Sequence, residues 1–168
     1  SRVYQARQGR AFSGLVEKAE AASGPQRASA PAPRGVAVPD PDADPLVLGR
    51  LEIPRIGVSA IVRDGDDDAT LAVAVGRVPG TTRPGERGSM ALAGHRDSFF
   101  RALGHIRADD VIRLRTPGRG YEYRVDSTEV VGAEEVRVLA PSGDAILTLV
   151  TCYPFGYVGH APDRFVVR

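Results

Sequence analysis

From residue 46 to the end of the chain, short segments either alternate apolar and polar residues with a period of two or form short apolar runs, such as residues 89–93. This alternation is typical of β-strands that bury one face, and glycine or proline between the segments predicts turns. Pro117 and Gly118, for example, separate two alternating segments. The pattern predicts about eight strands. They cover residues 46–53, 59–62, 89–93, 111–114, 121–125, 128–131, 146–152 and 165–167, with short helices expected at 69–75 and 98–103.

Strands at this spacing predict a mainly β fold whose sheet closes, or nearly closes, into a barrel. The chain of 168 residues is long enough for one domain with a hydrophobic core and an additional tail. Its formal net charge of +1 gives no sign of a broad basic surface, so we do not expect nucleic acid as a partner. No apolar run approaches the roughly 20 residues that a membrane-spanning helix needs.

The first 45 residues follow a different pattern. Apolar residues recur at helical spacing between Val3 and Ala22, which predicts a helix there. The stretch from Ser23 to Pro45 is rich in alanine and holds six of the 13 prolines. Because proline fixes φ and lacks an amide donor, we expect this stretch to be an extended linker. The chain therefore divides into an N-terminal helical arm with its linker, residues 1–45, and a β-barrel domain, residues 46–168.

Cys152 is the only cysteine of the chain, and it ends an apolar run that begins at Leu147. A single cysteine cannot form an intramolecular disulfide, so Cys152 is either a buried packing residue or a working thiol, and spacing alone leaves both open. A thiol becomes an effective nucleophile as the thiolate, which a nearby base or positive charge stabilises. Tyr153 and Pro154 follow it, where the chain has to leave the sheet.

Two residues elsewhere in the chain are candidates for the partners of such a thiol. His95 ends a short apolar run, and we favour it over His105 and over His160, which lies eight residues past Cys152 and ranks second. Arg164 begins the last predicted strand. If this strand pairs with the strand of Cys152, the guanidinium faces the thiol and stabilises an oxyanion. The alternative for Arg164 is a surface ion pair of little energetic value.

Two patterns resemble metal sites but lack the spacing that such sites require. The acidic stretch 64–68 begins like a calcium loop, but Ala69 and Val75 stand where the loop needs glycine and glutamate. We interpret this stretch as a solvated acidic turn. Cys152 and the histidines fit no zinc pattern. We expect neither a metal nor a cofactor.

Several segments in the same order resemble the sortases, the cysteine transpeptidases of the bacterial cell surface. Residues 148–152 fit the TLxTC signature of this family, and residues 93–97 resemble its histidine segment. Arg164 falls where the essential arginine of the family is expected. The stretches 76–81 and 84–88 resemble the segment that precedes the family's histidine.

Within the family, residues 152–155 and 159–162 look most like class D, although class E enzymes share much of this pattern. The resemblance implies an eight-stranded sortase-like β-barrel with one catalytic groove. It implies that Cys152 is the nucleophile, that His95 is the general acid and base, and that Arg164 stabilises the oxyanion or the substrate.

The resemblance also implies the substrates and the partners. These are LPxTG-like sorting signals, such as LPNTA, near the C-terminus of secreted proteins. Cleavage after the threonine would leave a thioester on Cys152, and an amine of the cell wall or a pilin lysine would accept the acyl group. We expect a membrane anchor upstream of Ser1 and a catalytic domain on the extracytoplasmic side of the cell membrane.

Four further residues are expected at the substrate: Thr151, Asp97, Tyr153 and His160. His160 stands where the family leads us to expect a small or polar residue, so the division of work between His160 and His95 is open. Two other functions compete with transpeptidation. A cysteine endopeptidase would use the same residues and transfer the acyl group to water, and a non-catalytic barrel would bind extended peptides in its groove.

Overall fold

The structure is a computed structural model that describes residues 44–168. The predicted N-terminal helix and nearly all of the predicted linker lie outside the described residues, so the division of the chain at residue 46 stays a prediction. In the described part of the chain, none of the helices has the length and apolar character needed to cross a membrane.

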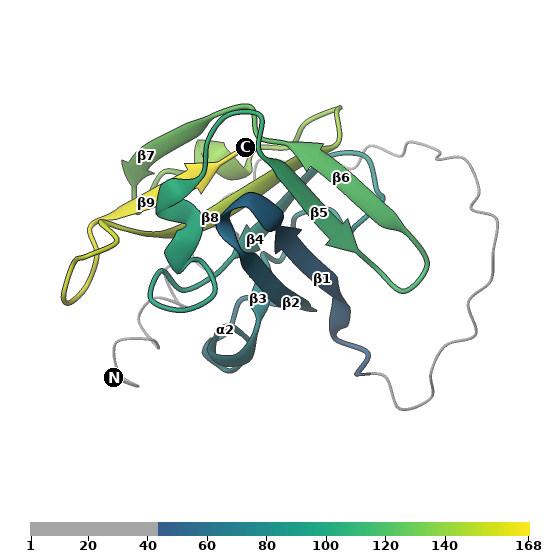
Figure 1. Ribbon diagram of the computed structural model, residues 1–168, viewed down its shortest axis with the longest axis horizontal. Helices are drawn as coiled ribbons and strands as arrows, with labels where there is room; N and C mark the ends of the chain where they lie inside the picture. Colours follow the sequence, from purple (N-terminus) through teal and green to yellow (C-terminus); the bar gives the residue numbers. More distant parts are fainter. Residues whose placement is uncertain (1–43) are drawn as a thin grey trace.

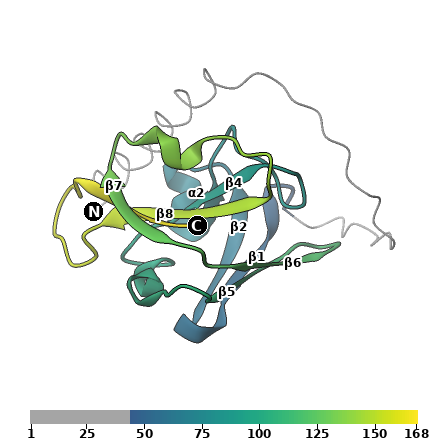
Figure 2. The same ribbon diagram turned by 90° about the horizontal axis from the view of Figure 1, so that it is seen from above.

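Nine strands form one curled sheet in the order β6-β5-β1-β2-β3-β4-β8-β9-β7 (Figure 1). Seen from above, the sheet curls from β5 and β6 through β1 and β2 to β8 and β7 (Figure 2). The pairs β2–β3 and β4–β8 are parallel, and the other neighbours are antiparallel. The strands are β1 Val47–Ile53, β2 Val58–Asp64, β3 Val75–Arg77, β4 Ser89–Ala93, β5 Val111–Arg115, β6 Gly120–Arg124, β7 Thr128–Gly132, β8 Ile146–Tyr153 and β9 Asp163–Val167.

The predicted mainly β fold with short helices is confirmed, and the eight predicted strands are all present with ends shifted by at most two residues. The sheet has a ninth strand, β3, which the sequence does not predict. Its three residues are too few to show alternation. Gly76 lets this strand fit between β2 and β4, because a Cβ atom there would lie 2.2 Å from the carbonyl oxygen of Gly65. Among residues 44–168 no pairing joins β6 to β7, so the sheet forms an open half-barrel.

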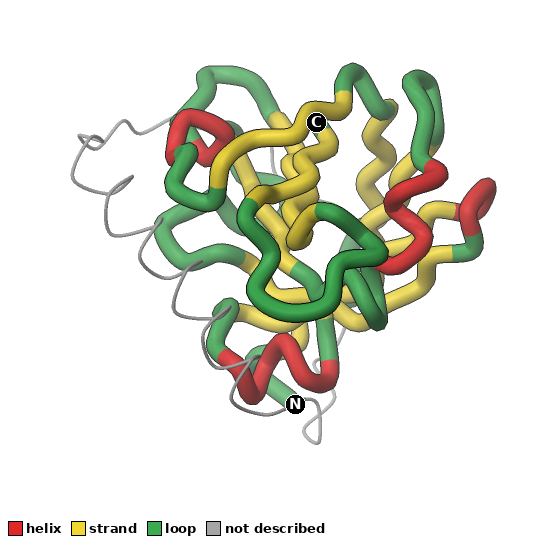
Figure 3. Tube along the Cα trace, turned by 90° about the vertical axis from the view of Figure 1, so that its left-hand side faces the viewer, coloured by secondary structure: helices red, strands yellow, loops and turns green. Residues whose placement is uncertain are grey.

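The helices are short and lie between strands (Figure 3). The predicted helix at 69–75 is present as α2, which begins after Asp67, and the carboxylate of Asp67 accepts a hydrogen bond from the amide of Thr70 at 3.0 Å. Such an N-cap stabilises the first turn of a helix. The predicted helix at 98–103 is a 3-10 helix, η2, that starts later. The helical segments are α2 Asp68–Val73, η1 Pro54–Ile56, η2 Arg101–His105 and η3 Val136–Leu139.

Both faces of the central strands β4, β8 and β9 are buried. Because side chains alternate along a strand, each strand supplies residues to two clusters. The cluster inside the curl of the sheet contains Leu92, Leu149 and Val167. The second cluster, on the other face, contains Ala93, Val150 and Val166 together with Leu71 of α2 and Leu139 of η3. Burial on both faces explains why β8 reads as a continuous apolar run.

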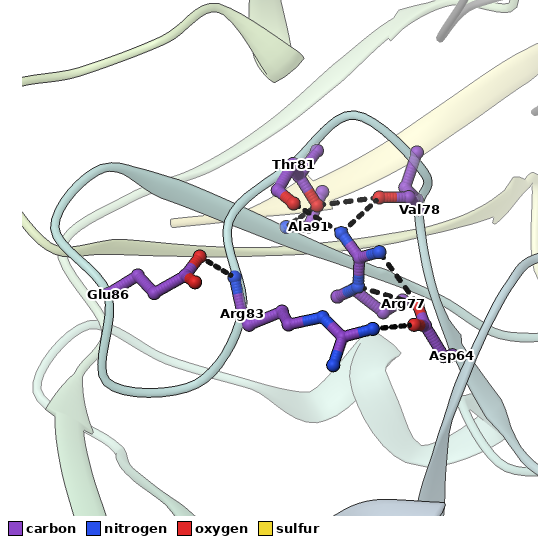
Figure 4. Close-up of polar contacts among 7 residues, drawn as sticks. All are labelled: Asp64, Arg77, Val78, Thr81, Arg83, Glu86 and Ala91. Atoms are coloured by element: carbon purple, nitrogen blue, oxygen red, sulfur yellow. Dashed lines mark hydrogen bonds and ion pairs between the residues drawn. The ribbon is translucent and has the colours of Figure 1, made fainter. Parts of the chain in front are cut away.

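A cluster of charged and polar side chains holds the loop between β3 and β4 (Figure 4). Arg77 pairs with Asp64 at the end of β2, with 2.7 Å between Nη2 and Oδ1, and it donates a hydrogen bond to the carbonyl of Thr81. Arg83 reaches the same carboxylate at 2.6 Å, and its amide donates to Glu86 at 2.7 Å. These contacts fix the entry into β4, the strand that leads to His95.

Candidate active site

Cys152 and Arg164 face each other across a strand pair. β8 and β9 are antiparallel, and Cys152 is in register with Arg164. Residues directly opposite in an antiparallel pair project to the same face, with Cβ atoms about 4.5–5.5 Å apart. The strand pairing on which the prediction for Arg164 depended is therefore present, and the guanidinium and the thiol leave the sheet side by side.

His95 lies two residues beyond the end of a third strand of the same sheet, β4. β4 runs parallel to β8 with Ala93 opposite Val150, and the amide of Gly94 extends this pairing by donating to the carbonyl of Val150 at 3.2 Å. Cys152 lies on the face of Val150 by alternation along β8. His95 and Cys152 each follow by two residues a member of the same cluster, Ala93 and Val150, so both lie at one end of it.

The three side chains are almost fully buried. The exposed fraction is 4% for His95, 1% for Cys152 and 1% for Arg164. Two backbone carbonyls orient the guanidinium, because Nη1 of Arg164 donates to Asp163 at 2.9 Å and to Ala161 at 3.3 Å. A cation held beside a thiol in a site of low dielectric is suited to stabilise negative charge on a reacting carbonyl oxygen.

Burial dominates the ionisation of the thiol. It raises the pKa of Cys152 above its ordinary value, while the charges of Arg164 and then Arg96 act to lower this pKa and that of Asp97 acts to raise it. Desolvation disfavours the thiolate because a charged sulfur loses its hydration in the interior. The two cations reduce this penalty without cancelling it, so Cys152 is mostly a neutral thiol near pH 7.

Burial also dominates the ionisation of His95. It lowers the pKa of the imidazole below its ordinary value, and the negative charges of Asp97 and Asp68 oppose this shift. The sequence gives no sign of a role for Asp68, because the acidic stretch 64–68 has the composition of a solvated turn. α2 brings Asp68 within electrostatic reach of His95, and Asp66 in the same stretch is buried rather than solvated.

Thr151 has a different setting from the one that its expected substrate contact suggests. Its side chain is fully buried, and its hydroxyl donates to the carbonyl of Gly94 at 2.7 Å. This hydrogen bond joins the residue before Cys152 to the residue before His95. Thr151 thus links β8, which carries Cys152, to the segment after β4 that carries His95.

The other three residues expected at the substrate differ in their exposure and in their contacts. Asp97 is exposed and lies close enough to influence the pKa of both Cys152 and His95. Tyr153 is half-buried at the end of β8, where its ring stacks on that of Phe165 with centroids 6.3 Å apart. His160 is exposed in the loop between β8 and β9.

Among the described residues, neither a group suited to a metal ion nor the cavity at the other end of β8 coincides with these side chains. In the range 44–168, no group of three or more histidine, cysteine or acidic residues is arranged to hold a metal ion. A cavity of about 420 Å³ lies at the opposite end of β8 from Cys152, lined in part by Tyr123, Ile146 and Arg168. None of the candidate catalytic residues lines it, so we do not assign the peptide groove to this cavity.

Residues 51–168 match the family described as the Sortase domain. The chain is 34% identical over 120 residues to Sortase D of Bacillus subtilis (strain 168), an alignment that covers 71% of this chain and 61% of that protein. It is 32% identical over 123 residues to Sortase A of Listeria monocytogenes, covering 71% of this chain and 54% of that protein. The chain thus spans less than two thirds of the length of these curated relatives.

Solved structures share the same fold. Sortase A from Corynebacterium diphtheriae is 28% identical with a TM-score of 0.68, and the match covers 75% of this chain and 60% of that one. A Clostridium perfringens Sortase D5 transpeptidase is 27% identical with a TM-score of 0.65, covering 72% of this chain and 76% of that one. The family match over residues 51–168 and these likenesses lead to one conclusion: this chain belongs to the sortase family, and its Sortase D relatives support class D within it.

Proposed function

We propose that this domain is a cysteine transpeptidase that cleaves an LPxTG-like sorting signal, such as LPNTA, after its threonine. The observation that carries the proposal is the register of Cys152 opposite Arg164, at the end of the apolar face that His95 also reaches. Membership of the sortase family supports the class of reaction. The named residues supply a nucleophile, a proton carrier and a stabilising cation.

In the first half of the reaction, the thiolate of Cys152 attacks the carbonyl carbon of the threonine. Negative charge develops on the carbonyl oxygen, and Arg164 stabilises it. Protonated His95 gives its proton to the leaving nitrogen as the C–N bond breaks. The N-terminal part of the substrate stays on Cys152 as a thioester, and the C-terminal part leaves as an amine.

In the second half, an incoming amine attacks the thioester carbonyl. Neutral His95 takes the proton of the attacking nitrogen, and the sulfur leaves as a thiolate. The product is a new amide, and the enzyme returns to its starting protonation state. The proposed donors of this amine are a peptidoglycan cross-bridge or stem peptide and a pilin lysine.

The reactive thiolate–imidazolium pair is a minor form of the resting enzyme. For a thiol and an imidazole at their ordinary pKa values, about 8.5 and about 6.5, this pair makes up about 1% of the molecules between the two pKa values. Burial raises the pKa of Cys152 and lowers that of His95, so the fraction here is smaller still. Activity then depends on the small population that is correctly protonated.

Intact-mass spectrometry tests the proposal directly. The protein is incubated with LPNTA- and LPxTG-type peptides, with and without an added amine. We expect a mass increase equal to the N-terminal part of the peptide, and an amine-linked product when the amine is present. Cys152→Ala removes the nucleophile and should abolish both signals, while Arg164→Lys keeps the charge but loses the guanidinium fork and should lower turnover.

Each remaining outcome of this experiment separates the competing functions. Hydrolysed peptide in the presence of every amine tried would favour the endopeptidase. Binding of the peptide without any adduct, unchanged in Cys152→Ala, would favour the non-catalytic barrel. No adduct with either class of peptide would overturn the proposed substrate.

Three contacts with substrate stay part of the proposal: Asp97, Tyr153 and His160. For Thr151 we propose that it supports the site from inside the sheet through its hydrogen bond to Gly94.

For the whole protein we propose a membrane anchor and an extracytoplasmic catalytic domain that needs no cofactor. Protease accessibility of the domain in protoplasts that express the full-length protein tests this location, and complete protection would contradict it.

A further inference from the structure

Arg96 directly follows His95, but its side chain binds another segment. Only 6% of this arginine is exposed. Its Nη2 donates to the carbonyls of Tyr157 at 2.6 Å and Gly159 at 3.2 Å, and its Nη1 donates to the carbonyl of Pro154 at 3.2 Å. The guanidinium carbon also lies 6.0 Å from the centre of the Tyr157 ring, within the range of a cation–π contact. One side chain thus holds three points of the loop 154–162 that joins β8 to β9.

The loop 154–162 is anchored by an aromatic ring only near its start. Phe155 packs edge-on against Tyr153 and Phe165, with ring centroids 6.0 Å and 5.3 Å away. Beyond Phe155 the chain is exposed up to His160, and Val158 is 95% exposed. The contacts of Arg96 with Tyr157 and Gly159 therefore fall in the part of the loop that packing does not secure.

Both ends of this loop adjoin catalytic residues. Cys152 lies two residues before Pro154, and Nη1 of Arg164 donates to the carbonyl of Ala161 near the other end. A shift of the loop would therefore displace the thiol and the guanidinium relative to each other. Arg96, which is covalently next to His95, connects the histidine to the same loop.

We propose that Arg96 is a positioning residue that keeps Cys152, Arg164 and His95 in one arrangement by fastening the loop 154–162 to the segment after β4. The catalytic part of this inference rests on the proposed function, whereas the fastening of the loop does not. A planar guanidinium offers five N–H donors in a fixed fork, which suits three carbonyls at separate places. Arg96→Lys keeps the charge but puts one nitrogen in place of the two, Nη1 and Nη2, that reach these carbonyls.

The charge of Arg96 has a separate effect on the thiol. The pKa of Cys152 depends on its burial and on the charges of Arg164, Arg96 and Asp97, and the two arginines lower it. Removing the charge at position 96 should therefore raise this pKa further, while a lysine should leave it near the wild-type value. Two substitutions thus separate the two roles: Arg96→Lys removes the fork alone, and Arg96→Gln removes both the fork and the charge.

Hydrogen–deuterium exchange of the peptide that covers residues 153–162 tests the fastening of the loop. We expect exchange at least tenfold faster in Arg96→Lys and in Arg96→Gln, with exchange in β1 unchanged. Arg101→Gln is the matched control, since Arg101 is an exposed arginine of the same connection, and it should leave the loop at the wild-type rate. Wild-type exchange of the loop in Arg96→Lys would overturn the proposal, and this variant serves alone if Arg96→Gln fails to fold.

Alkylation and turnover test the consequence for the site. Because Cys152 is the only cysteine, the rate of alkylation by iodoacetamide against pH reports on its thiolate without any peptide. The midpoint should move to higher pH in Arg96→Gln and stay near that of the wild type in Arg96→Lys. With an LPNTA peptide, kcat should fall at least tenfold in both variants with a smaller change in KM. Wild-type kcat in Arg96→Lys would overturn the positioning role.

The experiments distinguish this inference from the proposed function. If the wild type itself turns over no sorting peptide, the proposed function fails. The exchange rates still decide whether Arg96 holds the loop 154–162, and the alkylation midpoints still decide whether its charge acts on Cys152.

Discussion

Two buried threonines of β8 allow a controlled test of how the site is held together. Thr151 is 0% exposed and Thr148 is 1% exposed. The hydroxyl of Thr151 donates to the carbonyl of Gly94 at 2.7 Å. The hydroxyl of Thr148 has no hydrogen-bond partner among the described residues. Thr151→Val and Thr148→Val therefore make the same chemical change in the same strand, and only one of them removes a hydrogen bond.

The two substitutions should change the free energy of unfolding by different amounts and not in the same direction. Thr151→Val leaves the carbonyl of Gly94 without this donor in the interior, and an unsatisfied buried polar group costs about 1–3 kcal/mol. A loss of about 2 kcal/mol lowers the melting temperature of a domain of this size by roughly 5–12 °C. Thr148→Val removes an unpaired buried hydroxyl, so its free energy of unfolding should stay unchanged or rise by about 1 kcal/mol.

Urea unfolding followed by tyrosine fluorescence or circular dichroism measures both variants, since the chain has five tyrosines and no tryptophan. The slope of the free energy against urea should stay the same, so that the midpoints report stability alone. Equal destabilisation by Thr148→Val and Thr151→Val would refute the reasoning, because the cost would then come from packing at β8. Turnover of a sorting peptide should also fall more in Thr151→Val, since this hydrogen bond holds the residue before His95.

Other expectations follow from the same structure. The pH profile of kcat/KM should have its acid limb below the ordinary pKa of histidine and its alkaline limb above that of a thiol, because burial lowers the pKa of His95 and raises that of Cys152; limbs at the ordinary values would contradict this. The side-chain hydrogen bond from Arg55 lowers the pKa of Asp110, so this pair contributes stability above about pH 3.9 that is lost as the pH falls through the native pKa. Asp110→Asn should lower the urea midpoint at pH 7 and make that midpoint depend less on pH in the acid range. An unchanged pH dependence would show that the Arg55–Asp110 pair is not its source. Leu149→Ala should lower the free energy of unfolding by about 2–5 kcal/mol because Leu149 is fully buried in the central strand, and thermal unfolding that shows less than 1 kcal/mol, roughly the cost of one buried methylene, would contradict its core role.

The strands and the order of the site segments follow from the sequence by itself. Alternation marks strands that have a more buried and a less buried face, such as β5 and β6, and a short apolar run marks β4 and β8, which are buried on both faces. Both patterns are local properties of the sequence. The TLxTC segment around Cys152 and the segment around His95 are equally local, so the candidate residues of the site and the likeness to sortases are visible without a structure. The short strand β3 has no such periodicity, and only its fit between β2 and β4 makes it a strand.

The arrangement of the reactive groups depends on contacts between residues far apart in the chain. Register places Cys152 opposite Arg164, and the packing of α2 brings Asp68 near His95. Burial sets the direction of both pKa shifts, and burial is a property of the folded chain. In the sequence, Arg96 is only a polar residue that follows the histidine. Its role becomes visible in the structure, where its guanidinium binds three carbonyls of the loop 154–162. The sequence by itself determined which groups are candidates for the chemistry, and tertiary structure decided their positions, their charge states and what holds them, since all three arise from packing across the sheet.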